Sequence, residues 1–221
     1  MLRRWALRAL MPVGVIAFWT GMSIAAQRFP AQYDWRYMTI SVLIYPERNP
    51  AGHIFASAAL AACAFAGLLW VIALASVQRI RGLGILAAGY LCMILSSLLP
   101  ERLLRVPNGH EVLAILGFIS MCGGLVVVSA HYFSSQRDKP RVHPALLTAV
   151  ALSPIAAAAL TQAYLSYCRP ELPWVGLAWR TLGIPVLLSF ALWEWLACAV
   201  LSVLMTGMGI ALGAQARRNA F

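Results

Sequence analysis

Two short polar segments bring together the residue types that could do chemistry. Each begins with the triplet Pro-Glu-Arg, at residues 46–48 and 100–102, and each leads to a histidine. A histidine beside carboxylates can act as a general acid or base, or can bind a divalent metal ion. The candidate side chains in the two segments are Glu47, Arg48, His53, Glu101, Arg102 and His110.

A hydroxyl nucleophile is a second component that such a site could hold. Ser41, or else Thr39, precedes the first segment and could act as a nucleophile with His110 as its base. The alternative is that the charged groups pair with each other and with lipid phosphates, while the hydroxyls cap backbone groups. The chain has no HxxxH or HExxH spacing, so we expect no bound metal, and we expect no cofactor.

Glu194 is the third candidate, because it is the only charged residue in the apolar run 181–213. A carboxylate inside a membrane-length helix costs several kcal/mol if it is ionised and unpaired. Three of its four helical neighbours are small (Ala191, Ala197 and Cys198), which lets another helix approach this face. We therefore expect Glu194 to face the protein interior, neutral and hydrogen-bonded, either as a polar pin between helices or as a functional acid.

The composition places these residues in a membrane protein. Of the 221 residues, 62% are hydrophobic and only 11% are charged, whereas a soluble domain is about 25% charged. The net charge of +10 does not indicate nucleic-acid binding, because the basic residues lie in short segments between apolar runs. The five cysteines show no CxxC or metal-ligand spacing and suggest no disulfide framework.

Six apolar runs predict the fold, because each is long enough to cross about 30 Å of hydrocarbon. We expect an all-α, single-domain bundle (1–221) of six transmembrane helices near residues 9–27, 54–77, 82–100, 111–133, 144–166 and 183–209. The first run has the features of a signal peptide, but its apolar part is long for one, so we expect it to persist as the first span. The link VQRIRG between the second and third runs predicts a tight helical hairpin.

The distribution of Lys and Arg predicts the orientation. With both termini in the cytoplasm, ten of the seventeen basic residues lie inside and seven outside, as expected for an inner-membrane protein of a bacterium. The longest outer connection, residues 27–53, contains ISVLIY, which is apolar but too short to span. We expect this stretch to lie on the bundle as a re-entrant or interfacial piece.

Several short motifs resemble those of a known group. The chain has TISVL and PERNP after the first run, LLPE and GHEVLA around the start of the fourth, and LWEW in the sixth. It resembles an uncharacterised bacterial six-span (DUF-type) family and, more distantly, the Frag/DRAM group of eukaryotes, some of whose members act in GPI-lipid remodelling or autophagy. The resemblance implies a fold and a set of positions (Ile40–Leu43, Pro100–Glu101, His110 and Glu194), but no reaction. The departure is in residues 46–53, where the family has a Gly-rich turn.

Three functions follow as hypotheses. In the first, an outer-side pocket formed by Ser41, Glu47, Glu101 and His110 above Glu194 handles a lipid or amphiphile, as a hydrolase or transferase. In the second, the chain is a non-catalytic accessory or scaffold subunit of a larger membrane complex. In the third, it is a small proton-coupled transporter in which Glu194 carries the proton. The expected partners are membrane lipids and, in the second case, other membrane protein subunits.

Overall fold

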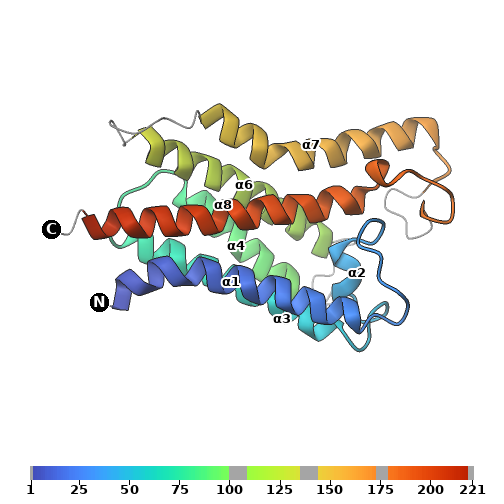
Figure 1. Ribbon diagram of the computed structural model, residues 1–221, viewed down its shortest axis with the longest axis horizontal. Coiled ribbons are helices and arrows are strands. Elements are labelled where there is room, and N and C mark those ends of the chain that lie inside the picture. Colours follow the sequence, from blue (N-terminus) through green and yellow to red (C-terminus); the bar gives the residue numbers. More distant parts are fainter. Residues whose placement is uncertain (1, 100–108, 135–143, 173–178, 219–221) are drawn as a thin grey trace.

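The computed structural model describes residues 2–99, 109–134, 144–172 and 179–218, and every regular element in these ranges is a helix (Figure 1). Six long helices lie side by side, and a short one, α2, lies at one end of them. The elements are α1 (Leu2–Gln27), α2 (Ile40–Ile44), α3 (His53–Ala75), α4 (Leu83–Leu98), α6 (Gly109–Ser134), α7 (Pro144–Cys168), the 3-10 turn η2 (Val186–Leu188) and α8 (Phe190–Arg218).

The six long helices pack in a closed order. Along this order each helix contacts the next: α1, α3, α4, α6, α7, α8 and then α1 again. Because α1 begins and α8 ends on the same side, the two chain ends lie together, opposite α2 (Figure 1). We call the side that carries α2 the α2 end of the bundle, and the other side the terminal end.

Five of these helices are long and apolar enough to cross a membrane: α1, α3, α6, α7 and α8. The sixth, α4, is apolar but has 16 residues, which at 1.5 Å per residue is about 24 Å. The expectation of an all-helical membrane bundle is confirmed. The third expected span, near residues 82–100, is the shorter helix α4. Its length is limited by Gly82, which has a φ of 90° and lies just before the first residue of α4.

The helix boundaries lie within two residues of the expected runs, except at the start of α1, which begins seven residues early, and at both ends of the last helix, α8. We expected this helix to begin near residue 183, but α8 begins at Phe190. Gly183 has a φ of 71°, which a helix cannot contain, and Pro185 precedes the separate turn η2. Glu194 is therefore the fifth residue of α8 and lies near its α2 end, about 6 Å along the axis from Phe190.

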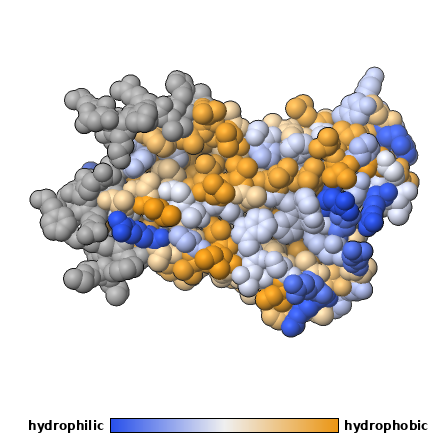
Figure 2. Space-filling model, in the orientation of Figure 1, coloured by the Kyte–Doolittle hydropathy of each residue, from blue (hydrophilic) through white to orange (hydrophobic). Residues whose placement is uncertain are grey.

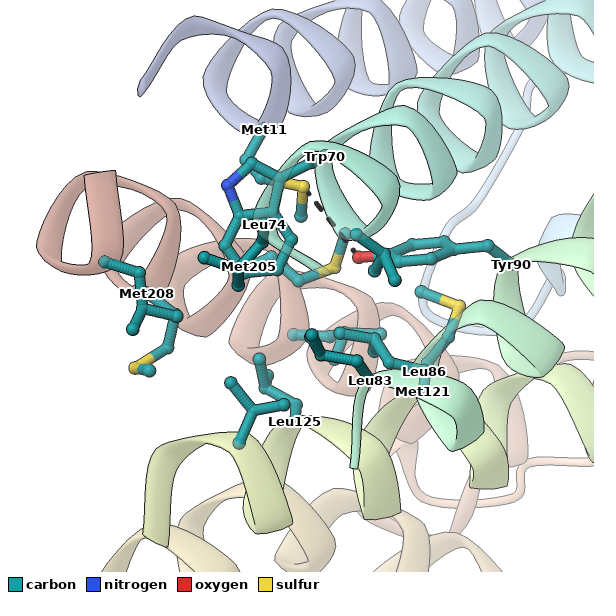
Figure 3. Close-up of a cluster of buried hydrophobic side chains, with 14 of the residues drawn as sticks. Met11, Trp70, Leu74, Leu83, Leu86, Tyr90, Met121, Leu125, Met205 and Met208 are labelled. Carbon is teal, nitrogen blue, oxygen red and sulfur yellow. Dashed lines mark hydrogen bonds between the residues drawn. The ribbon is translucent and has the colours of Figure 1, made fainter. Parts of the chain in front are cut away.

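The core at the terminal end is built from large apolar side chains of five helices. Figure 3 shows Trp70 and Leu74 of α3, Tyr90 of α4, Leu125 of α6 and Met205 of α8 directed into one cluster. Two of its polar groups have partners: the Trp70 indole donates to the Leu7 carbonyl (2.9 Å), and the Tyr90 hydroxyl contacts the Met11 sulfur (3.9 Å). This packing joins α1, α3, α4, α6 and α8.

The outer surface follows the pattern of a membrane protein. Hydrophobic residues cover much of the face seen in Figure 2, and hydrophilic ones gather at the α2 end. The first connection, residues 28–52, lies at this end, and Ile40, Val42 and Leu43 of α2 are buried against the bundle. The expectation that ISVLIY lies on the bundle as a short segment is confirmed.

Adjacent glycines in α6 provide a test of the α4–α6 contact. A Cβ at Gly124 would lie 2.7 Å from the Leu86 backbone nitrogen of α4, whereas a Cβ at Gly123 would meet nothing within 4 Å. We expect Gly124→Ala to destabilise the protein by about 1–3 kcal/mol through overpacking. Gly123→Ala gains helix propensity of up to about 1 kcal/mol and should be neutral or stabilising. Thermal unfolding in detergent measures both, and equal stability of the two variants would contradict the close contact.

Candidate functional site

Glu194 contacts the backbone of the first connection. Its Oε2 accepts a hydrogen bond from the amide of Ile40, the first residue of α2, at 2.9 Å. The first amides of a helix have no partner within the helix, and the residue before α2, Thr39, makes no side-chain cap. Glu194 therefore supplies from α8 the acceptor that α2 lacks. The expectation that Glu194 faces protein and is hydrogen-bonded is confirmed, while its protonation state stays a prediction.

Trp195, the next residue, holds the same connection by its indole. The Nε1 group donates to the Met38 carbonyl and to the Tyr33 hydroxyl, both at 3.1 Å, and Tyr33 in turn donates to Met38 at 2.8 Å. Burial raises the pKa of Tyr33 well above its usual value, so the phenol stays a neutral donor. Trp19 of α1 packs against Trp195, with 5.7 Å between ring centroids.

Asp34 ties the connection to the segment before α8. Its buried carboxylate accepts two hydrogen bonds from the Arg36 guanidinium, at 2.8 and 3.0 Å, and one from the Arg36 amide at 3.2 Å. It also lies 3.3 Å from Arg180. The hydrogen bonds from Arg36, with the charge of Arg180, hold the pKa of Asp34 below its ordinary value. Tyr37 adds a bond from its hydroxyl to the Ile184 carbonyl at 2.9 Å.

These contacts form one unit, which we call the loop clamp. It fastens residues 33–40 to α8 and to the segment that precedes α8. Its members are Tyr33, Asp34, Arg36, Tyr37, Arg180, Glu194 and Trp195. Of these, sequence reasoning selected only Glu194. The sequence DWRY (residues 34–37) contained a usable signal. Aromatic and charged residues side by side are more typical of a packed loop than of a solvated one.

His110 is buried at the start of α6, where it contacts α4. Its Nδ1 lies 2.7 Å from the Ser96 carbonyl, and the Ser96 hydroxyl lies 3.3 Å from the His110 carbonyl. A nitrogen facing a carbonyl must carry the proton, so we assign Nδ1 as the donor. His110 thus joins the end of α4 to the start of α6, and no hydrogen bond joins its Nε2 to another described residue.

Ser41 and His110 do not form a nucleophile–base pair in the described residues. The Ser41 hydroxyl lies 2.7 Å from the Thr39 hydroxyl, and no hydrogen bond joins it to His110. Tyr45, which follows α2, contacts the start of α6 instead. Its ring centroid is 5.5 Å from that of His110, and its hydroxyl is 3.5 Å from Glu111. The catalytic role of the pair stays a prediction.

The first polar segment forms a turn at the start of α3. His53 is the first residue of α3, and its Nδ1 lies 3.1–3.2 Å from the carbonyls of Pro50 and Asn49. Glu47 and Arg48 are exposed, and neither forms an ion pair with a described residue. Asn49 was missed, although it is fully buried and donates to the carbonyls of Ala25 and Leu43 at 3.1 and 3.2 Å.

Only the end of the second polar segment belongs to the described residues. Glu101 and Arg102 lie outside the described residues, so their expected proximity to His110 stays a prediction. Within the described ranges, no three His, Cys, Asp or Glu side chains converge as metal ligands.

A groove between α1 and α8 lies next to the loop clamp and shares Tyr33 and Trp195 with it. It has a volume of about 400 Å³, and its wall is largely aromatic and apolar: Trp19, Met22, Ser23, Ala26, Tyr33, Trp35, Trp195, Leu196 and Ala199. A second, more polar hollow adjoins it, because both share Ala26 and Tyr33 while the second adds Gln27 and Gln32. Neither wall contains Ser41, Glu47 or His110, which differs from the pocket that we expected.

Comparisons with protein-family models, with curated proteins and with solved structures gave no match. The resemblance to the six-span family therefore stays a prediction.

The bond between Glu194 and Ile40 predicts different results for two substitutions. Gln also carries an acceptor oxygen, so Glu194→Gln should keep the Ile40 amide protected from hydrogen exchange. Glu194→Leu should raise the hydrogen-exchange rate of the Ile40 amide about tenfold or more, because such a bond contributes about 1–2 kcal/mol. Hydrogen-exchange mass spectrometry of the peptide covering residues 38–44 measures both. Equal exchange in the Leu variant and the wild type would show that Glu194 does not hold α2.

Asp34 predicts that the loop clamp weakens in acid. Its pKa is lower in the folded protein than the ordinary value of about 3.9, so its contribution to stability is present above that pH and is lost as the pH falls through the lowered pKa. Proteolysis of residues 28–52 should therefore accelerate in the wild type below about pH 4. An acid-active protease in the acid range and a neutral protease at pH 7 measure this, with the variants compared at the same pH.

Asp34→Asn should already show the faster cleavage at pH 7 and should gain little more in acid. Glu47→Gln is the matched control, because Glu47 is exposed in the same connection and should leave the wild-type profile unchanged. An identical acid response of wild type and Asp34→Asn would rule out this role.

Proposed function

We propose that the chain is an integral membrane protein that binds a lipid or another amphiphile in the groove between α1 and α8. The observation that carries this proposal is the aromatic groove of about 400 Å³ beside the loop clamp, continuous with a more polar hollow. Ligand sites are typically concave and apolar with a few polar groups at one place.

The polar atoms of the groove wall favour an apolar occupant. The indoles of Trp19 and Trp195 already donate to Ser202 and to Met38 and Tyr33, and the Ser23 hydroxyl donates to its own helix. A polar ligand would therefore find few unused partners within the groove. The amides of Gln27 and Gln32 lie in the adjoining hollow and offer donors and acceptors. An acyl chain in the groove with its headgroup at the glutamines fits both parts.

We further propose that the bundle crosses the membrane six times. In support, α4 packs between α3 and α6, which are both of membrane-spanning length, and the chain ends lie together at the terminal end. The excess of Lys and Arg on that side favours a cytoplasmic location of both termini. The ligand groove would then open in the leaflet that faces away from the cytoplasm.

The alternatives keep distinct signatures. A hydrolase or transferase would need His110, Ser41 and Glu101 to meet the ligand headgroup. A proton-coupled transporter would lose activity in Glu194→Gln, even though this variant retains the acceptor for Ile40. An accessory subunit would keep its assembly when the groove is filled.

Filling the groove tests the proposed function. Ala199 lines it, whereas Val203, one turn further along α8, is an exposed residue outside it. We expect Ala199→Phe to lower the binding of dioleoyl-phosphatidylethanolamine by about tenfold, equivalent to about 1.4 kcal/mol. Val203→Phe should bind like the wild type. Native mass spectrometry of the purified protein with the added lipid measures the occupancy. Equal lipid binding by both variants would refute the groove as the site and would favour the accessory-subunit hypothesis.

A further inference from the structure

A second groove lies on another side of α1, against α3. It has a volume of about 490 Å³ and shares no lining residue with the groove against α8. Its wall is apolar except for one threonine: Val13, Ile16, Ala17, Thr20, Gly21 and Ile24 of α1, with Phe55, Ala58 and Ala59 of α3. The floor is formed where the helices approach closely, because a Cβ at Gly21 would lie 2.3 Å from that of Ala59.

The groove has the length of one membrane leaflet. From Val13 to Ile24 the α1 wall covers eleven steps, or about 17 Å at 1.5 Å per residue. One half of the hydrocarbon core is about 15 Å thick. An acyl chain that entered at the α2 end would therefore find a continuous apolar wall over its whole depth.

Arg28 lies at the α2 end of this groove. It follows α1 by one residue, and its guanidinium carbon is 4.2 Å from the ring centroid of Phe55, which lines the groove. Stacking on an aromatic ring holds an arginine in place while its N–H groups stay available. The side chain is thus a fixed cation at the groove mouth.

Arg28 has no carboxylate of its own among the described residues. Arg36 and Arg180 share Asp34, and Arg169 pairs with Glu171, but no described acid lies within ion-pair distance of Arg28. A phosphate accepts two N–H groups of a guanidinium at once and would complete this charge. The groove thus combines a hydrocarbon wall with an unmatched cation four residues beyond its last α1 residue.

We propose that this groove binds an anionic phospholipid, with one acyl chain between α1 and α3 and the phosphate on Arg28. The site is separate from the amphiphile groove of the proposed function and does not depend on it. The length of the groove matches an acyl chain better than a protein segment. The positive charge of Arg28 favours a lipid with a net negative charge over a zwitterionic lipid.

Lipid competition tests the proposal on the full chain. The purified protein in a neutral detergent is mixed with equal amounts of dioleoyl-phosphatidylglycerol and dioleoyl-phosphatidylcholine, and native mass spectrometry counts each bound species. We expect the wild type to favour phosphatidylglycerol by about fivefold, the contribution of one arginine near an anionic group. Arg28→Gln should abolish the preference, and Arg28→Lys should retain part of it.

Matched controls separate this site from its alternatives. Arg48→Gln removes another exposed arginine at the same end and should leave the preference intact, as should Ala199→Phe in the other groove. Ile16→Trp fills the α1–α3 groove without changing charge and should also lower phosphatidylglycerol binding, which covers the case in which Arg28→Gln does not fold. Millimolar inorganic phosphate should not compete.

Three results would overturn the proposal. The first is an equal preference for phosphatidylglycerol in Arg28→Gln and Arg48→Gln, which would attribute the preference to the general surface charge. The second is full competition by inorganic phosphate, which would remove the role of the acyl chain. The third is normal phosphatidylglycerol binding by Ile16→Trp, which would exclude the groove.

Discussion

The connection between α1 and α3 can lie on the bundle only because its backbone groups find partners there. A peptide amide that leaves water without an acceptor costs about as much as a lost hydrogen bond, and several such groups would lift the connection off the helices. Glu194 accepts from the Ile40 amide, and Asn49 donates to the carbonyls of Ala25 and Leu43. Glu194 and Asn49 at the α2 end therefore satisfy backbone groups of the connection.

The amphiphile groove depends on the same contacts. Tyr33 and Trp35 come from the connection, while Trp19 and Trp195 come from the two helices that the groove separates. If the connection moved away, the groove would lose part of its wall and the polar hollow beside it. Under the proposed function, binding at this groove and attachment of the connection are coupled, because a ligand that contacts the wall would stabilise the attached state.

Much of the fold was predictable from local patterns, but the pairing of distant residues was not. The length of the apolar runs predicted the long helices, and the helical spacing of small residues around Glu194 predicted its inward direction. The start of α8 was placed too early because Gly183 and Pro185 were not used as helix breakers. No local pattern relates Trp195 to Tyr33, which is 162 positions away, and only the folded bundle brings them together.

The candidate site shows the same limit for function. Residue types selected His110 and Ser41 as a pair, yet His110 is bonded to Ser96 of α4 and Ser41 to Thr39. Such short polar residues near helix ends first satisfy local donors and acceptors, so their chemistry can be judged only after those partners are counted. For His110 this count finds no described partner of Nε2, whereas the bond to Ile40 explains Glu194 as a structural acceptor without requiring a second role.

Helix α1 is the wall that the two grooves share, and its two sides differ for a physical reason. Toward α3 it carries glycines, and a Cβ at Gly14 or Gly21 would lie within 3 Å of an alanine Cβ of α3, so the helices touch and leave only a shallow channel. Toward α8 the large rings of Trp19 and Trp195 hold the helices apart and leave a deeper, aromatic space. Among the described residues, the α3 side ends at Arg28, which has no described acid within ion-pair distance. Under the two proposals, one helix thus presents two different sites to lipid, selected by side-chain size on one side and by charge on the other.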